Sequence, residues 1–434
     1  MPLQRLRNKI KNHNLSPAFG EIVKISSTVI MAAGLRVSIG DTVRMTSKDK
    51  SLETLGMVTE IDKQTFSITP FTFIEGFRVG DTVYLHESGL QIPVGNELLG
   101  RVVNPFMEPI DSLGKINASC YEPIMKEPIA AMKRGMINEQ FCVGVRSIDA
   151  LLSCGKGQKL GIFAGSGVGK STLMGMIVRG SEAPIKVVAL IGERGREVPE
   201  FIEKNLGGNL ENTVIVVATS DDSPLMRKYG AFAAMSIAEH FKKEGKDVLF
   251  IMDSITRFAM AQREIGLALG EPPTSKGYPP SSLTLLPQLM ERAGKEIGSG
   301  SITAFFTVLV EGDDMSDPIA DQSRSILDGH IVLSRELTDF GIYPPINILN
   351  SVSRVMDDVV TPEHQSAALK FRRMYSLLKE NELLLRIGAY ESGADPELDE
   401  AIAKKELLND FIRQKSKESI SFDEVVKSLT QIVS

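Results

Sequence analysis

The chain has 434 residues, of which 42% are hydrophobic, so it is too long for one hydrophobic core and we expect two or three domains. Its net charge of −6 argues against a general nucleic-acid binder, and its longest apolar runs fall short of the ~18 residues that a membrane span needs. Three cysteines with no CxxC or metal-ligand spacing favour a reduced compartment, and we expect a cytoplasmic protein.

Residues 1–15 have the pattern of a short basic amphipathic helix. Leu3, Leu6 and Ile10 recur at helical spacing among arginines and lysines. A helix this short is marginal alone and needs a partner to cover its apolar stripe. We predict a docking element here, for a partner subunit or for an acidic membrane surface.

The rest of the chain changes character twice. Residues 16–90 hold short β-rich runs broken by Gly, Asp and Pro every eight to twelve residues, which predicts a small N-terminal β-barrel. Residues 91–345 alternate helical stretches with apolar runs that lack polar alternation, as in KLGIFA and VLFIMDS, which predicts an α/β domain with a parallel sheet. Residues 346–434 are helical and charged, and we predict a C-terminal helical domain.

The run LGIFAGSGVGKSTLMGMI predicts a phosphate-binding loop between a strand and a helix. Ala164 stands where the pattern G-x-x-x-x-G-K-[ST] has its first glycine, and a small residue still permits the tight turn. Backbone N–H groups of the loop can hold an anion, Lys170 can reach the outer phosphates, and the Ser171 hydroxyl can ligate Mg²⁺. The predicted nucleotide-binding residues are Gly165, Ser166, Gly167, Val168, Gly169, Lys170, Ser171 and Thr172.

Two carboxylates end neighbouring apolar runs. Asp253, in DVLFIMDS, is predicted to hold Mg²⁺ through water, or else only to cap the next helix. Glu193, in ALIGERGREV, would lie at the same edge of the sheet, where it can polarise a water for attack on a γ-phosphate. The alternative for this charged stretch is a surface turn with internal ion pairs. Arg194 and Arg257 are expected close behind the residues that touch the nucleotide.

Five segments follow one another along the chain: GVRSIDALLSCGKGQKLGIFAGSGVGKSTL, LIGERGREVPEF, DSITRFAMAQREIGLALGEPPTSKGYPPS, EGDDMSDPIADQSRSILDGHIVLSR and YPPINILNSVSR. In this order they resemble the rotary-ATPase catalytic-subunit family and, within it, the type III secretion ATPases of the flagellar export branch. The resemblance covers nearly the whole chain and implies a RecA-like core between a β-barrel and a helical domain.

The resemblance also implies roles for individual residues. Lys170 and Glu193 are catalytic, and Tyr343 in GIYPP is the aromatic that stacks on adenine. Arg354, closing NSVSR, is the arginine finger, although spacing alone would favour a salt-bridged structural arginine. Because one chain holds both Glu193 and Arg354, it can form every interface of a homohexamer, each subunit completing the site of its neighbour.

The predicted function is ATP hydrolysis in flagellar type III protein export, coupled to docking, unfolding or chaperone release of export substrates. The implied partners are a stator or regulator subunit at the N-terminal helix, a central-stalk protein, the export gate, and export substrates with their chaperones, at the inner membrane. No nucleic acid is expected. Alternatives are a virulence-type secretion ATPase, a hexameric RNA translocase, an ion-coupled synthase subunit, and a scaffold that only binds nucleotide.

Overall fold

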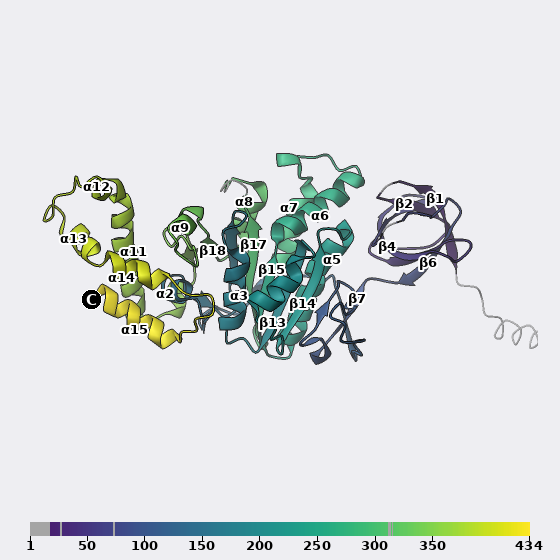
Figure 1. The fold of residues 1–434 in the computed structure, drawn as a ribbon. Coiled ribbons are helices and arrows are strands. Elements are labelled where there is room, and N and C mark those ends of the chain that lie inside the picture. Colours follow the sequence, from purple (N-terminus) through teal and green to yellow (C-terminus); the bar gives the residue numbers. More distant parts are fainter. Residues whose placement is uncertain (1–17, 27, 73, 311–313, 315) are drawn as a thin grey trace, which may run out of the picture. The chain divides into compact units, whose positions relative to one another are not determined.

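The computed structural model describes residues 18–26, 28–72, 74–310, 314 and 316–434 (Figure 1). The predicted helix of residues 1–15 lies outside this part of the chain. The chain divides into two compact units, residues 1–91 and 92–434. In the described part, no helix combines the length and the hydrophobicity needed to cross a membrane.

The first unit is a closed six-stranded barrel, as the spacing of its β-rich runs predicts. Its strands follow one another around the barrel in the order β1-β2-β5-β4-β3-β6. Alternate side chains point inward and form the core, among them Ile30, Val43, Val58 and Ile68, each fully buried. The strands are β1 (Phe19–Ile25), β2 (Ile30–Ala33), β3 (Thr42–Thr46), β4 (Glu53–Ile61), β5 (Thr65–Pro70) and β6 (Thr82–Glu87).

The second unit is built on a nine-stranded sheet in the order β19-β18-β12-β17-β15-β13-β14-β8, with β16 beside β17. The central strands are parallel and almost wholly buried, which agrees with the predicted sheet. Their bounds are β8 (Val102–Val103), β12 (Lys159–Ala164), β13 (Ile185–Glu193), β14 (Thr213–Thr219), β15 (Asp247–Asp253), β16 (Gly294–Lys295), β17 (Ser301–Leu309), β18 (Gly329–Val332) and β19 (Val352–Ser353).

Helices cover this sheet, and three of those described, α5, α6 and α8, begin with a side-chain cap. Ser223 accepts a hydrogen bond from the N–H of Met226 at the start of α5, and Ser254 does the same for Arg257 at the start of α6. Figure 1 shows α5, α6 and α7 grouped beside strands β13 to β15, and α5 packs on all three of these strands. These helices are α3 (Lys170–Gly180), α4 (Glu197–Glu200), α5 (Pro224–Lys243), α6 (Ile255–Ala268), α7 (Pro280–Met290), α8 (Pro318–Ile326), α9 (Arg335–Asp339) and α10 (Met356–Val359).

The C-terminal part is helical, as predicted, and its helices share one hydrophobic core with the sheet. That core runs from Ile162 on β12 and Leu173 on α3 to Phe371, Leu408 and Leu429 on the C-terminal helices. The predicted domain boundary at residue 345 therefore crosses a continuous core and stays a prediction. The C-terminal helices are α11 (Pro362–Glu380), α12 (Glu382–Arg386), α13 (Pro396–Ala403), α14 (Lys405–Ile412) and α15 (Phe422–Val433), and α2 (Arg146–Leu151) packs against α11, α14 and α15.

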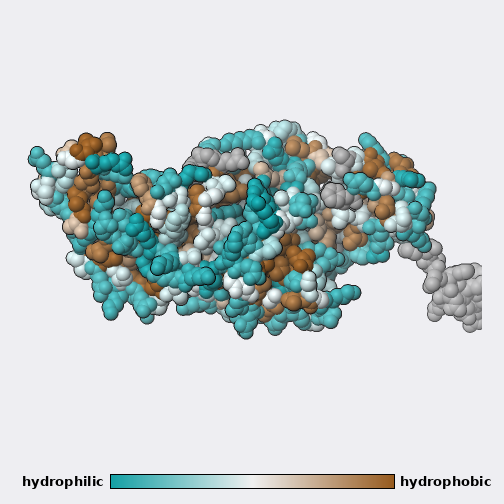
Figure 2. Space-filling model, viewed as in Figure 1, coloured by the Kyte–Doolittle hydropathy of each residue, from teal (hydrophilic) through white to brown (hydrophobic). Residues whose placement is uncertain are grey.

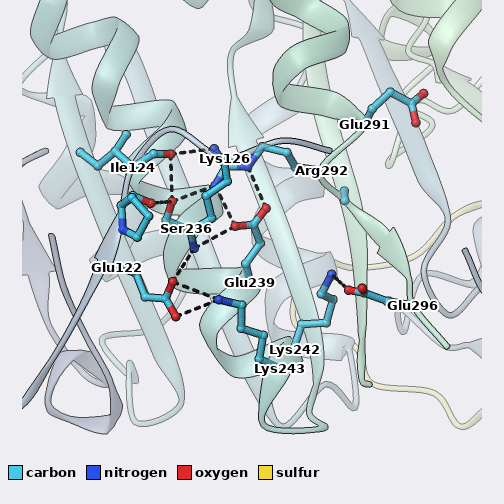
Figure 3. A network of polar contacts seen from close by, with 12 residues as sticks. Glu122, Ile124, Lys126, Ser236, Glu239, Lys242, Lys243, Glu291, Arg292 and Glu296 are labelled. Carbon is cyan, nitrogen blue, oxygen red and sulfur yellow. Dashed lines mark hydrogen bonds and ion pairs between the residues drawn. The ribbon is translucent and has the colours of Figure 1, made fainter. Parts of the chain in front are cut away.

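Strands β7 (Gln91–Val94) and β9 (Cys120–Pro123) form a two-stranded ribbon. A charged network holds the segment that follows this ribbon against helix α5. Arg292 is fully buried and donates to both carboxylate oxygens of Glu239, at 2.7 and 2.8 Å. It also donates to the carbonyl of Ile124 at 2.8 Å, while Lys126 reaches Glu239 at 3.1 Å (Figure 3). Burial alone would raise the pKa of Glu239, but Arg292 and Lys126 outweigh it and hold the pKa below its usual value.

Candidate nucleotide site

The predicted phosphate loop lies between β12 and α3, at the carboxyl end of the sheet. Gly167 and Gly169 adopt φ angles of 79° and 91°, a left-handed conformation that glycine takes without strain. Helix α3 begins at Lys170, so its free backbone N–H groups face the loop. The sequence pattern therefore folds into the local geometry that binds an anion.

The loop opens into a pocket of about 790 Å³. Val168 does not line it, because its side chain is buried in the core at 2% exposure. Asp253 lies beneath it, at 3% exposure. The predicted residues that line the pocket are Gly165, Ser166, Gly167, Gly169, Lys170, Ser171, Thr172, Glu193, Arg194 and Arg257.

Strand register brings the two predicted carboxylates together. Asp253, the last residue of β15, pairs with Leu190 in the sheet, and the neighbouring strand β13 continues from there to Glu193. A bulge at Gly192, where φ is 76°, shifts the register and turns Glu193 toward the pocket. Any side chain on Gly192 would start 2.6 Å from the Cβ of Arg257, so only glycine fits there.

Lys170 joins these two carboxylates. Its ammonium pairs with Asp253 and lies 3.5 Å from a carboxylate oxygen of Glu193. Thr307 on β17 donates its hydroxyl to Asp253 at 2.6 Å and holds that carboxylate in place. The lysine thus neutralises the acids that the sequence assigns to metal binding and water activation.

The charges in this cluster shift one another's pKa. Burial would lower the pKa of Lys170, but attraction to Asp253 and Glu193 outweighs burial, so the pKa is raised and the lysine stays charged. The pKa of Glu193 is raised to about 7, first by burial and then by repulsion from Asp253, against the attraction of Lys170. A carboxylate with a pKa near neutrality can exchange a proton during a reaction at physiological pH.

Two arginines line the same pocket in different states. Arg194 is largely exposed, and its guanidinium lies 3.8 Å from a carboxylate oxygen of Glu197. An ion pair this long contributes little to the conformation of the charged stretch. Arg257 is more enclosed, and its buried Nε has no hydrogen-bond partner in the described part of the chain. Its charge lowers the pKa of Glu193, opposing burial. Arg257 therefore places a positive charge at the pocket, where an anionic ligand can bind.

Tyr343 lies outside the set of residues that line the pocket, but its segment runs beside the loop. Pro345 is within 3.9 Å of the position that a Cβ would take on Gly169. The Tyr343 side chain is 52% exposed, which leaves its ring free to stack. The predicted adenine contact is compatible with this position and remains a prediction.

Arg354 lies at the other end of the sheet from the phosphate loop. Arg354 directly follows β19. This strand runs antiparallel to β18, and its last residue, Ser353, pairs with Gly329, the first residue of β18. Arg354 is exposed, and within the described residues no hydrogen bond or ion pair of its guanidinium is found. The structure does not bring this arginine to the pocket of its own chain, nor does it support a salt-bridged structural role.

Sequence reasoning missed two residues of the site. Thr307 lies in the apolar run SITAFFTVLVEG and is fully buried. Its only sequence signal is a hydroxyl side chain within a run that is expected to be buried. Arg335, on α9, donates to the carbonyl of Ser166 in the phosphate loop at 3.1 Å. The two residues are 169 positions apart, so no local pattern connects them.

The oxygen donors of the site suit Mg²⁺. This ion usually takes one or two protein carboxylates or hydroxyls and completes its shell with substrate phosphates and water. Ser171 lines the pocket and Asp253 lies beneath it, which is such a set. In the described residues no group of three or more acidic, His or Cys side chains that could hold a metal ion is found.

Comparisons with known proteins agree with this geometry. Residues 144–353 match the nucleotide-binding domain of the ATP synthase alpha/beta family, and residues 360–431 match the T3SS EscN ATPase C-terminal domain. The chain is 64% identical over 434 residues, the whole of both proteins, to the flagellum-specific ATP synthase of Helicobacter pylori strain 26695.

Solved structures give the same result for the fold. The assembled ATPase EscN of the enteropathogenic E. coli type III secretion system matches with a TM-score of 0.90 and 44% identity, over 96% of this chain and 100% of that one. EscN in complex with its central stalk EscO matches with a TM-score of 0.89 and 43% identity, again over 96% of this chain and 100% of that one.

These matches confirm the predicted fold class, the nucleotide-binding ATPase core and the flagellar export function. The chain belongs to the ATP synthase alpha/beta family and, within it, to the flagellum-specific type III secretion ATPases.

Proposed function

We propose that this flagellar export ATPase works as a homohexamer in which each active site is completed by Arg354 of a neighbouring copy. The observation that carries the proposal is the separation within one chain: Lys170 and Glu193 line the pocket, whereas Arg354 lies at the opposite end of the sheet. The EscN relative was solved as an assembled ATPase, which supports a ring.

In this proposal ATP enters the pocket with its phosphates on the loop of residues 165–169. Lys170 turns from Asp253 to the outer phosphates, since a triphosphate offers it more negative charge than the carboxylates do. Release of Lys170 leaves Glu193 free to accept a hydrogen bond from the attacking water and orient it in line with the γ-phosphate. Arg354 of the neighbouring copy stabilises the charge that develops in the transition state.

Mg²⁺ would be held by Ser171 directly and by Asp253 through water, and when bound it neutralises charge on the phosphates. Thr307 keeps Asp253 oriented for that role through its 2.6 Å hydrogen bond. Arg257 and Arg194 add positive charge behind the phosphates. Tyr343 offers an aromatic face to the adenine ring.

The partners proposed for the ring are a stator or regulator subunit at residues 1–15, a central stalk, the export gate, and substrates with their chaperones. Residues 1–15 would also hold the ring at an acidic inner-membrane surface. Exposed Leu383, Leu384 and Ile387 gather on and just after α12, where Figure 2 shows a hydrophobic patch at the upper left. An apolar patch of this kind marks a protein contact, and the complex of EscN with its stalk EscO supports a stalk as one occupant.

The test is the dependence of Mg²⁺-ATPase activity on protein concentration, measured together with mass by light scattering. Activity per subunit should rise steeply over the range in which hexamers form, because a monomer lacks the arginine in trans. Full activity in samples shown to be monomeric would overturn the proposal. A coupling role is tested in cells, where Glu193→Gln should stop flagellar export while the protein is still recruited.

A further inference from the structure

The connection between α14 and α15 is exposed along almost its whole length, yet it contains one buried polar side chain. Gln414 is 4% exposed, whereas Arg413 before it and Lys415 to Ser419 after it face solvent. Burying an amide costs free energy unless its donors and acceptor find partners. The burial of this single residue therefore points to a set of specific contacts.

Both ends of the Gln414 side-chain amide are hydrogen-bonded. Its side-chain oxygen accepts from the backbone N–H of Arg146 at 2.8 Å. Its amide nitrogen donates to the carbonyl of Gly144 at 2.9 Å and to that of Glu418 at 3.1 Å. Its own backbone N–H donates to the carbonyl of Tyr343 at 2.8 Å. One residue thus links three segments that are far apart in the sequence.

Arginines hold the same connection from the ATPase core. Arg146 donates to the carbonyl of Arg413 at 3.1 Å and pairs with Glu418 at 2.7 Å. Arg179, in the last turn of α3, donates to the carbonyl of Ser416. Helix α3 starts at Lys170 of the phosphate loop. The connection is therefore fixed to the helix that carries the phosphate site on one side, and to the backbone of Tyr343 on the other.

We infer that Gln414 is a positioning residue for the nucleotide base: it sets where the ring of Tyr343 stands relative to the phosphate loop. The inference rests on the proposed stacking role of Tyr343. The Tyr343 ring is half exposed, and the hydrogen bond from the Gln414 N–H restrains its backbone, beside the bonds that the neighbouring Ile342 and Ile346 make. Removing the Gln414 side chain frees the backbone that makes this bond, whereas the phosphate loop keeps its own contacts.

Two ligands separate the base from the phosphates. ATP uses both parts of the site, whereas inorganic tripolyphosphate has no base and reports on the phosphate loop alone. Binding is measured by calorimetry in the Glu193→Gln background, which prevents turnover. Gln414→Ala should weaken ATP about 5- to 100-fold, the range for losing one base-stacking contact, and leave tripolyphosphate unchanged. Gln414→Glu should behave likewise, because it keeps the length of the side chain but loses both amide donors.

Two further variants complete the design. Tyr343→Ala should weaken ATP to a similar extent, and Gln414→Ala added to Tyr343→Ala should cost nothing more, since the positioned ring is gone. Lys417→Ala, an exposed change in the same connection, is the matched control and should leave both affinities unchanged. In the active chain, Gln414→Ala should raise the KM for ATP and leave kcat within about twofold.

The outcomes separate the inference from the proposal beneath it. If Tyr343→Ala weakens ATP and Gln414→Ala does not, the positioning role is wrong and the stacking role stands. Equal loss of ATP and tripolyphosphate in Gln414→Ala means general damage to the fold and also overturns the inference. If Tyr343→Ala leaves ATP affinity unchanged, the stacking role itself fails, and the inference fails with it.

Discussion

The backbone N–H of Arg354 donates a hydrogen bond to the carbonyl of Asp328, 2.9 Å away. The Asp328 side chain in turn accepts from the N–H of Lys159, the first residue of β12, whereas the phosphate loop follows Ala164, the last. A strand of this length rises about 3.3 Å per residue, so roughly 17 Å separate its ends. Arg354 therefore cannot serve the pocket of its own chain without refolding the edge of the sheet.

Mixing two inactive variants should restore ATP hydrolysis. Lys170→Ala keeps Arg354 but has a damaged pocket, and Arg354→Ala keeps the pocket but lacks the arginine. Mixed rings contain some interfaces with both parts intact, and an arginine finger contributes roughly 10³- to 10⁵-fold in rate in other phosphoryl-transfer enzymes. The measurement is phosphate release as a function of mixing ratio.

The double variant Lys170→Ala/Arg354→Ala, mixed with Lys170→Ala, is the control and should stay inactive, since no intact pocket is present. If mixed oligomers of native size form and remain inactive, while Arg354→Ala alone keeps concentration-dependent activity, the role in trans is wrong.

The raised pKa of Glu193 predicts a pH dependence of catalysis. With a pKa of about 7 in the free enzyme, only the deprotonated form can orient water, so kcat/KM for ATP should rise with pH up to about 7 and level off above it. Glu193→Gln should bind ATP but hydrolyse it very slowly, with a profile that retains only the titration of ATP itself. A wild-type profile that is flat between pH 6 and 8 after this correction would exclude Glu193 as the titrating group.

Lys170→Ala should abolish hydrolysis and also change stability with pH. A carboxyl whose pKa is raised in the folded state binds more protons folded than unfolded, so stability falls as pH rises from its ordinary 4.5 toward about 7. Without Lys170, Glu193 and Asp253 face each other uncompensated, so this fall should grow beyond the roughly 3 kcal/mol that a pKa raised from 4.5 to about 7 implies.

Thermal unfolding at pH 6 and pH 8.5 measures this effect, without nucleotide. The variant Lys170→Ala/Glu193→Gln removes the repulsion and should recover most of the loss at pH 8.5. No difference between the single and double variants would mean that Lys170 does not neutralise this pair in the nucleotide-free protein.

Arg292→Met should destabilise the second unit strongly, because it leaves the buried Glu239 with only one of its two cations. Loss of one partner from a buried ion pair typically costs about 3–5 kcal/mol. Adding Glu239→Gln to Arg292→Met should recover part of the loss, since residue 239 is then neutral and Lys126 keeps its ion pair with Glu122. Calorimetric unfolding provides the measurement.

Lys243 gives the matched comparison for that experiment. It contacts Glu122 of the same network at 2.9 Å, but its side chain is 55% exposed. Lys243→Met should therefore change stability by less than about 1 kcal/mol. Equal effects of the two substitutions would show that burial does not set the strength of this network.

Local patterns predicted the parts of the site that come from strand ends. Each of Lys170, Glu193 and Asp253 follows or ends an apolar run, and parallel strands bring such ends together, so their proximity follows from the order of residues along the chain. The barrel was predictable for a similar reason, because its turns are marked by Gly, Asp and Pro at regular spacing.

Contacts between distant segments could not be predicted in this way. The bonds from Arg335 to Ser166 and from Gln414 to Tyr343 join residues that no periodicity relates. The bulge at Gly192 that turns Glu193 toward the pocket depends on the neighbouring strand and on Arg257, not on the local sequence. Likewise, the continuity of the core across residue 345 is a property of packing, which composition does not reveal.

That continuous core has a consequence for biosynthesis. Leu429 and Val433 of α15 belong to the same buried cluster as Ile162 and Leu173, which flank the phosphate loop. During translation the sheet can form before the C-terminal helices are synthesised. The apolar side chains of the sheet that pack against α11, α14 and α15 in the folded protein are then exposed to solvent. The nascent chain can therefore acquire a finished nucleotide site only after α15 has left the exit tunnel, and until then its exposed apolar surface is a natural target for folding chaperones.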